Sequence, residues 1–393
     1  MLLLRLLLLL RLLLLLLAAW QRPVPTFSPR IRLPLSTDHA ELTQRPPFWR
    51  RTAALAWRQL RTDGVADALR VVLGAFRIVG ARAAHASLYA LPVISRHIAA
   101  DPQADLLFHV SHRHFLASGL SFDERVACAL SHFRHETEHC DSAYLAAVYQ
   151  GEGLLLWRAQ VGGVDYTMRL RTTPELRHEG PVSVVLLADG QWLHETSFAW
   201  IDGRLFQTPK VSGRILFVTR NQSLASNAPG LGRFRQDFPQ NSPSYFCLAA
   251  VHGVARAHGQ TQIAGIFYDR QIAFDRQYET GFRRSYCEFW ATFGGTPLPR
   301  LAMLMPVPVQ VPDIESLKPK HRSRAKARRT HWSEISAGTA ALLSDHLRTA
   351  SAPARWPAHP PAHPPAHSAA VASPALWAAA DVMQFGASFA GLI

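Results

Sequence analysis

Lysine and cysteine are both scarce in this chain of 393 residues. The lysines are Lys210, Lys318, Lys320 and Lys326, so arginine supplies nearly all of the positive charge. The 4 cysteines show no Cys-x-x-Cys spacing, which excludes a disulfide-stapled miniprotein and indicates free thiols in a reducing compartment. The sequence also lacks a nucleophile elbow, a Walker loop and a dinucleotide-binding glycine motif, so no motif of these kinds indicates which reaction the protein could catalyse.

The charge that is present is one-sided. Lys and Arg number 42 against 28 Asp and Glu, which gives a net charge of +14. Hydrophobic residues make up 48% of the chain, which excludes a wholly disordered protein. A basic chain favours anionic partners. Because no recognised nucleic-acid module accompanies the charge, we expect an anionic membrane surface as partner, no specific nucleic acid, and a protein partner of unknown identity.

The two ends of the chain differ in composition from its middle. Residues 1–20 hold fourteen leucines interrupted by Arg5 and Arg11, a length that can span a bilayer as a helix. Two interpretations stay open for this segment: an anchor that leaves the bulk of the chain in the cytoplasm, or a low-complexity leader. Residues 21–44 are expected to be a linker and 334–393 an Ala/Pro/His-rich tail, so the folded domain is expected over 45–333.

Helical patterns dominate the start of this domain. Over residues 48–91, apolar residues recur at intervals of three and four, and arginines occupy many of the other positions. Such a basic amphipathic segment can lie on an anionic membrane, or it can pack into the fold with a solvated arginine face, and both interpretations stay open. Ser121 and Glu124 have the spacing of a capping box and predict a helix over 121–140.

The middle of the domain changes to strand patterns. Strands are predicted over residues 153–160, 165–171, 181–188, 192–201, 214–219, 263–268 and 301–309. Gly162-Gly163 predicts a hairpin, and the helix predicted over 243–258 predicts a parallel crossover between its two flanking strands. A further helix is predicted over 274–293. We therefore predict an α+β fold with an N-terminal helical part and a mixed, largely antiparallel sheet with flanking helices, arranged as in acyltransferases.

A His-Glu-Thr-Glu-His segment at 135–139 matches the HExxH pattern. Histidines four residues apart share one helix face and can both bind zinc, while Glu136 between them can act as the catalytic general base. The candidate metal ligands on this face are His135, His139, His132 and Cys128. Because the apolar stripe of the helix lies on the opposite side, the histidine face is expected to be solvated, and a metal site is the alternative interpretation.

Asn227, Gly230 and Gly232 form a candidate cofactor loop. The pattern Asn-x-x-Gly-x-Gly is close to the Gln/Arg-x-x-Gly-x-Gly/Ala loop that binds acyl-coenzyme A in N-acetyltransferase-like folds. Backbone amides of such a loop, at the start of a helix, can hold a pyrophosphate. A loop without a ligand is the alternative interpretation.

Three separated blocks, in order, resemble a known family. The first, at 112–133, contains Leu-Ser-Phe-Asp-Glu-Arg; the second, at 286–295, contains Tyr-Cys-Glu-Phe-Trp and Gly-Gly; the third is the basic run at 318–329. Together they resemble the VirK/YbjX family of bacterial proteins over residues 45–333. In this alignment His132 matches a histidine of the family, whereas His135 and His139 do not.

The resemblance implies a cytoplasmic or membrane-associated protein of Gram-negative bacteria, linked to virulence, envelope integrity and resistance to host stress. It implies no settled biochemical activity, so whether the protein is an enzyme stays open. We consider three alternative functions. The first is envelope support from the cytoplasmic side of the inner membrane, the second is acyl transfer from acyl-coenzyme A, and the third is zinc-dependent hydrolysis.

Overall fold

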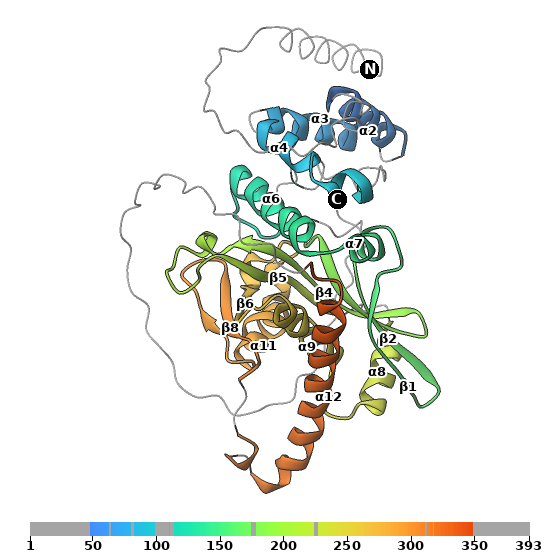
Figure 1. The fold of residues 1–393 in the computed structure, drawn as a ribbon, viewed down its shortest axis with the longest axis vertical. Helices are drawn as coiled ribbons and strands as arrows, with labels where there is room; N and C mark the ends of the chain where they lie inside the picture. The colour runs from blue at the N-terminus through green and yellow to red at the C-terminus, as the bar shows by residue number, and fades with distance from the viewer. Residues whose placement is uncertain are drawn as a thin grey trace. The chain divides into compact units, whose positions relative to one another are not determined.

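The computed structural model describes residues 48–62, 64–79, 82–98, 110, 114–173, 178–223, 227–310, 313–316 and 318–348. The leucine-rich segment 1–20, the linker 21–44 and residues 349–393 of the predicted tail lie outside these described residues. The described part contains one mixed sheet with flanking helices, which confirms the predicted α+β class (Figure 1). No helix of this part is both long and apolar enough to cross a bilayer.

Separate helices replace the single helical pattern predicted over 48–91. They are α2 (Phe48–Thr62), α3 (Val65–Val79), α4 (Arg82–Tyr89) and the π-helix η2 (Val93–Ile98). Gly64 separates the first two with a φ of 97°, a backbone conformation that glycine adopts far more easily than other residues. This break lets α2 and α3 pack against each other.

The next two helices begin at side-chain caps. Helix α6 (Phe122–His139) has the predicted capping box, in which the Glu124 amide donates to Ser121 Oγ at 3.3 Å and the Ser121 amide to Glu124 Oε2 at 2.8 Å. Helix α7 (Ser142–Tyr149) begins at Asp141, which accepts from the Tyr144 amide at 2.7 Å. The local sequence therefore sets where both helices start.

The sheet has eight strands in the order β1-β2-β3-β4-β5-β6-β8-β7. Their bounds are β1 (Leu154–Val161), β2 (Val164–Arg171), β3 (Val182–Ala188), β4 (Gln191–Asp202), β5 (Arg214–Ser223), β6 (Gln262–Ile266), β7 (Thr296–Pro297) and β8 (Ala302–Pro306). Neighbours are antiparallel except β5 and β6, which pair in parallel through the crossover helix α9 (Pro243–Ala257). This confirms the predicted mixed, largely antiparallel sheet.

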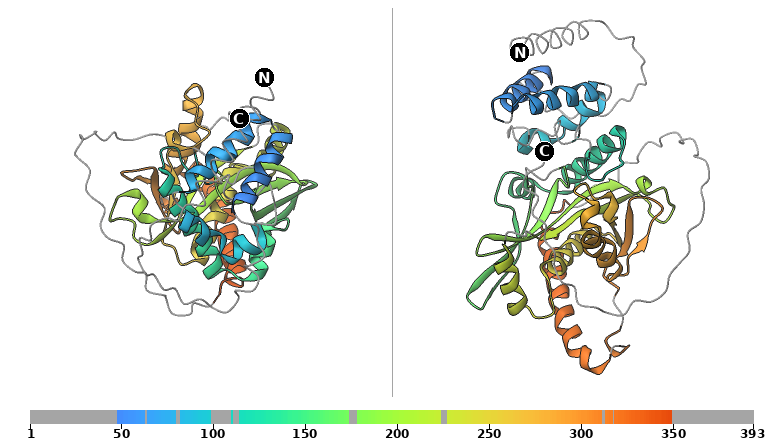
Figure 2. Two further views of the ribbon diagram at one scale, coloured as in Figure 1. Left: turned by 90° about the horizontal axis from the view of Figure 1, so that it is seen from above. Right: turned by 180° about the vertical axis from the view of Figure 1, so that it is seen from behind.

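Helices cover both faces of the sheet. Helices α6 and α7 lie on one face, and α9 lies on the other with α12 (Pro319–Ser344) beside it (Figures 1 and 2). All of β3 and most of β4 are buried. Since successive side chains of a strand point to opposite faces, continuous burial requires cover on both sides.

Three predicted segments differ from the structure. The strand predicted to end at 219 continues to Ser223 as β5, and the candidate cofactor loop that begins at Asn227 is the start of the helix α8 (Ala228–Asp237). The helix expected over 274–293 is broken into η8 (Arg276–Tyr278), α10 (Glu279–Arg283), the π-helix η9 (Arg284–Glu288) and α11 (Phe289–Ala291). The domain boundary expected at 333 falls inside α12.

The second half of α12 belongs to the folded core. Ile335, Thr339 and Leu343 are buried and lie four residues apart on one helix face. Gly253 of α9 permits this packing, because a Cβ atom there would lie 2.6 Å from the backbone oxygen of Ser336. The Ala-rich segment that was predicted to belong to a tail therefore forms a helix up to residue 344, and this helix packs closely against α9.

Candidate functional site

The histidine face of α6 is buried, so the prediction of a solvated face is wrong. His132, His135 and Cys128 are all buried, and His139 is half-buried. The helical wheel identifies one apolar stripe, but α6 contacts β4 as well as α4 and η2. A helix packed between two layers buries its polar face too, provided that the polar groups find hydrogen-bond partners.

His135 lies in a hydrogen-bonded relay between Arg214 and His258. The Arg214 guanidinium, which can only donate, donates from Nη1 to His135 Nδ1 at 2.9 Å. The proton of the neutral His135 ring is therefore on Nε2, which donates to His258 Nδ1 at 2.9 Å. By the same reasoning, neutral His258 carries its proton on Nε2. His135 thus has no free nitrogen lone pair to offer a metal ion.

Burial keeps these two rings neutral. Burial, His258 and Arg214 hold the pKa of His135 well below its usual value. Burial, His139 and Arg214 lower the pKa of His258 to about 3. The Trp200 ring, which packs 4.1 Å from His135 and 4.7 Å from His258 between ring centroids, contributes to this desolvation.

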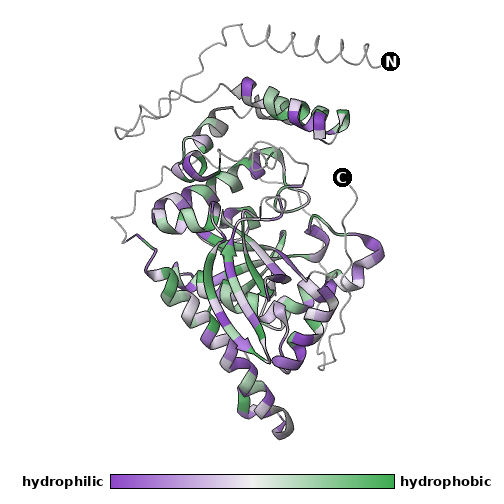
Figure 3. Ribbon diagram, turned by 90° about the vertical axis from the view of Figure 1, so that its right-hand side faces the viewer, coloured by the Kyte–Doolittle hydropathy of each residue, from purple (hydrophilic) through white to green (hydrophobic). Residues whose placement is uncertain are grey.

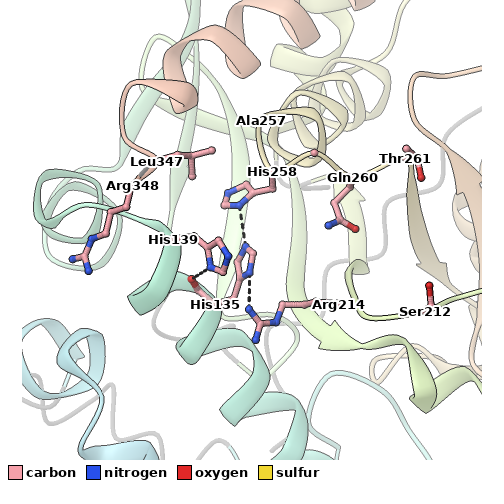
Figure 4. Close-up of a pocket in the computed structure, with 11 residues that line it drawn as sticks. His135, His139, Ser212, Arg214, Ala257, His258, Gln260, Thr261, Leu347 and Arg348 are labelled. Carbon is pink, nitrogen blue, oxygen red and sulfur yellow. Dashed lines mark hydrogen bonds between the residues drawn. The ribbon is translucent and has the colours of Figure 1, made fainter. Parts of the chain in front are cut away.

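His139 completes the group of rings. It stacks on His135 with ring centroids 4.3 Å apart, and its Nδ1 donates to the His135 backbone oxygen at 3.0 Å. The three histidines line an open cleft of about 530 Å³ at the amino ends of β5 and β6. Figure 4 shows His135 between His258 and Arg214, with the guanidinium of Arg348 directed away from the rings.

The other two metal candidates lie apart from this cleft. His132 Nδ1 accepts from the Trp200 amide at 3.2 Å, so its Nε2 donates to the Tyr149 hydroxyl at 2.9 Å. Burial, with Arg214 nearby, lowers the pKa of His132 to about 3. Burial also raises the pKa of the Cys128 thiol to about 12. Within the described residues, no three His, Cys, Asp or Glu side chains are placed to share a metal ion.

Glu136 is not placed to act as a base in the cleft. Its side chain is fully buried and accepts from the Tyr144 hydroxyl of α7 at 3.4 Å. Burial raises its pKa to about 8, although Tyr144 and Trp200 act to lower it. Glu136 is therefore protonated at neutral pH, and it does not line the cleft.

Arg214 and His258 are functional candidates that the sequence analysis missed. His258 is 123 positions from His135 and Arg214 is 79 positions away. One is the C-cap of α9 and the other opens β5, and neither lies in a recognisable motif. Only the parallel crossover, which returns the chain to the start of β6, brings them to the end of α6.

The predicted cofactor loop is the start of α8. Asn227 is its N-cap, and the side-chain oxygen accepts from the Gly230 amide at 3.2 Å. Its amide nitrogen donates to the Trp192 backbone oxygen at 3.0 Å. A Cβ atom at Gly230 would lie 2.8 Å from Leu193, whereas Gly232 faces open space. Asn227 therefore already takes up one of the backbone donors that a pyrophosphate would need.

A buried polar cluster lies near the carboxyl end of β5, away from the histidine cleft. Arg220 contacts Glu179, and its Nε is 3.6 Å from Glu195 Oε2. Gln271 Nε2 donates to Glu179 Oε2 at 2.7 Å, and the Thr173 hydroxyl donates to Glu195 Oε1 at 3.0 Å. Burial and Glu195 raise the pKa of Glu179, against the effect of Arg220. Two carboxylates thus share one guanidinium.

Comparison with known proteins agrees with the first of the three sequence blocks, at 112–133, and does not reach the other two. No curated protein and no solved structure matches this chain. Residues 82–211 match the model of a family described as protein of unknown function (DUF535), a segment that runs from α4 past the end of β4. DUF535 contains VirK/YbjX, so the predicted resemblance to that family is confirmed over residues 82–211.

Proposed function

We propose that the protein binds the anionic surface of a bacterial inner membrane from the cytoplasmic side and supports envelope integrity during stress or virulence. The VirK/YbjX resemblance supports the envelope role. The observation that carries the membrane contact is a row of exposed apolar side chains on α3 beside arginines. No other element of the described part shows such a row.

Helix α3 is apolar on two sides, and only one side is buried. Ala68, Val71, Val72 and Ala75 are buried. On the adjacent side, the exposed fraction is between 38% and 47% for each of four apolar residues at helical spacing, Val65, Leu69, Leu73 and Phe76. An apolar stripe left in water at this spacing is typical of helices that lie in the membrane interface.

Helix α2 adds an aromatic residue and positive charge. Trp57 is 55% exposed, and the Arg61 guanidinium lies 4.8 Å from its ring centroid. Tryptophan and arginine are both favoured at the lipid headgroup level, where the ring is amphipathic and the guanidinium meets phosphate. Hydrophobic and hydrophilic residues alternate along these helices in Figure 3. The combination fits an anionic lipid surface.

Vesicle sedimentation of the full chain tests this proposal. We expect retention on phosphatidylglycerol vesicles at physiological salt and loss of retention in Leu73→Glu, because a carboxylate would enter the interface. Leu155→Glu is the matched control, since Leu155 is a 39% exposed leucine on β1. Failure of the parent protein to sediment, or equal loss in both variants, would argue against the proposal.

Acyl transfer from acyl-coenzyme A is a second candidate, favoured by the parallel β5–β6 pair. Ligands of open sheets bind outside the carboxyl ends of parallel strands. At that end of β5, Glu195 Oε2 is buried without a hydrogen-bond partner and is a candidate base. A set of acyl-coenzyme A compounds should raise the melting temperature of the protein, less so in Glu195→Gln. No shift with any of them would count against acyl transfer.

A further inference from the structure

We propose that the cleft lined by His139, Arg214 and His258 binds a phosphate group, as inorganic phosphate or as the phosphomonoester of a small molecule or lipid headgroup. The proposal goes beyond membrane binding, because the cleft shares no residue with α2 or α3. A volume of about 530 Å³ is large enough for a small ligand.

The first observation is charge. Among the described residues, Arg214 and Arg348 line the cleft and no carboxylate does, although the Arg348 guanidinium is directed away from the histidine rings. Asp202 lies opposite Arg214 on β4 and interacts with its charge without forming an ion pair. Arg214 is largely buried, and its ion-pair partner in the described part of the chain is Glu138, whose Oε2 is 3.5 Å away on a half-exposed side chain. Such a pair is weak because solvent screens it. A guanidinium that is desolvated and poorly neutralised favours an anion beside it.

The second observation is the direction of the hydrogen bonds. The relay runs from the Arg214 guanidinium through His135 and ends with the N–H of His258 Nε2. No acceptor for this N–H is found among the described residues. Ser212 and Thr261 add hydroxyl groups to the wall of the cleft. These N–H and O–H groups can donate hydrogen bonds to a ligand that is rich in acceptor oxygens.

The carboxyl ends of α6 and α9 also reach the cleft, and helix carboxyl ends disfavour anions. Several of their terminal carbonyls, however, are already hydrogen bonded. His139 Nδ1 donates to the His135 oxygen at 3.0 Å, and the Gly259 and Gln260 amides donate to Arg256 and Ala255 at 2.9 Å. This capping leaves Arg214 as the dominant charge of the cleft.

Calorimetric titration of the full chain with inorganic phosphate tests the proposal. We expect a dissociation constant of about 1 mM or lower. Ser212 is exposed, so Ser212→Asp should keep the fold and its melting temperature while weakening binding by about tenfold or more through charge repulsion. Ser333→Asp, the same substitution at an exposed serine of α12 that does not line the cleft, is the control and should bind like the parent protein. Arg214→Gln should abolish binding.

Two further titrations identify the source of the phosphate, and a third, with acetate, tests whether the cleft prefers phosphate to another anion. Tighter binding of glycerol 3-phosphate indicates a soluble metabolite, and tighter binding of a short-chain phosphatidic acid indicates a lipid headgroup. Acetate binding as tightly as phosphate at equal ionic strength would overturn the phosphate assignment. The proposal is also overturned if no phosphate compound binds, or if Ser212→Asp binds like Ser333→Asp. Leu73→Glu should bind phosphate normally, so this test fails or succeeds independently of membrane binding.

Discussion

Glu136 shows how burial decides the chemistry of a single side chain. The HExxH pattern assigns it the role of a base, which requires an ionised carboxylate near the metal ligands. In the fold it lies against Tyr144 of α7, and one of its oxygens is buried without a hydrogen-bond partner. The neutral acid is therefore the form that the folded protein stabilises.

We expect Glu136→Gln to be more stable than the parent protein at pH 8 and similar to it at pH 5. The pKa of Glu136 is raised to about 8 in the folded state, from about 4.5 unfolded. Between these values the folded state binds the extra proton, so the free energy of unfolding falls as pH rises, by about 1.4 kcal/mol per pH unit. Urea unfolding at both pH values measures the difference. Parallel pH profiles for the two proteins would contradict the assignment.

At the scale of elements, α6 depends on its first turn for its position. The capping box at Ser121 and Glu124 satisfies orphan amides, and Arg300 pairs with Glu124 from the loop before β8. The same helix carries His135 and His139 at its far end. An error in where the helix begins would rotate these rings away from Arg214.

Ser121→Ala should therefore lower the free energy of unfolding by about 1 kcal/mol, because the Glu124 amide loses its acceptor. Ser131→Ala, in the middle of the same helix, has no cap to remove and should cost far less. Chemical denaturation of both variants provides the comparison. Equal losses would mean that the cap does not stabilise α6.

At the scale of the whole molecule, the three-layer arrangement buries an unusual amount of imidazole. His132, His194 and His252 are buried and His258 is half-buried, and desolvation lowers their pKa values to about 3, 4, 3 and 3 respectively. All four are neutral in the folded state at pH 7. His252 has no hydrogen-bond partner for either ring nitrogen among the described residues.

Stability is expected to be lost as pH falls below about 6.5. Each of these histidines binds a proton in the unfolded chain at about pH 6.5 but stays neutral when folded, so each lowers the free energy of unfolding by up to 1.4 kcal/mol per pH unit, roughly, until the folded pKa is reached. Urea midpoints at pH 7, 6 and 5 measure the slope. His252→Leu should reduce that slope by about one proton and should not destabilise the protein at pH 7. An unchanged slope would refute the buried neutral ring.

The local sequence was sufficient for the elements whose signals are local. The Ser121 cap, the Gly162-Gly163 hairpin and the crossover from β5 to β6 were all predicted, because capping, turn chemistry and apolar periodicity act over a few residues. The three sequence blocks that carry the family resemblance can likewise be recognised without a structure. The α8 helix was missed, since its signal is an Asn cap followed by Pro and two glycines, which equally describes a loop.

The sequence by itself therefore determined the fold class, the order of most strands and the resemblance to a known family over residues 82–211, because these depend on patterns that are contiguous along the chain. Only the tertiary structure decided which faces are buried and which distant residues meet. A helical wheel cannot show that α6 is covered by a sheet and by helices, nor that His258 and Arg214 meet His135. Long-range contacts set the ionisation of Glu136 and of the histidines, and so they set the chemistry available to the cleft.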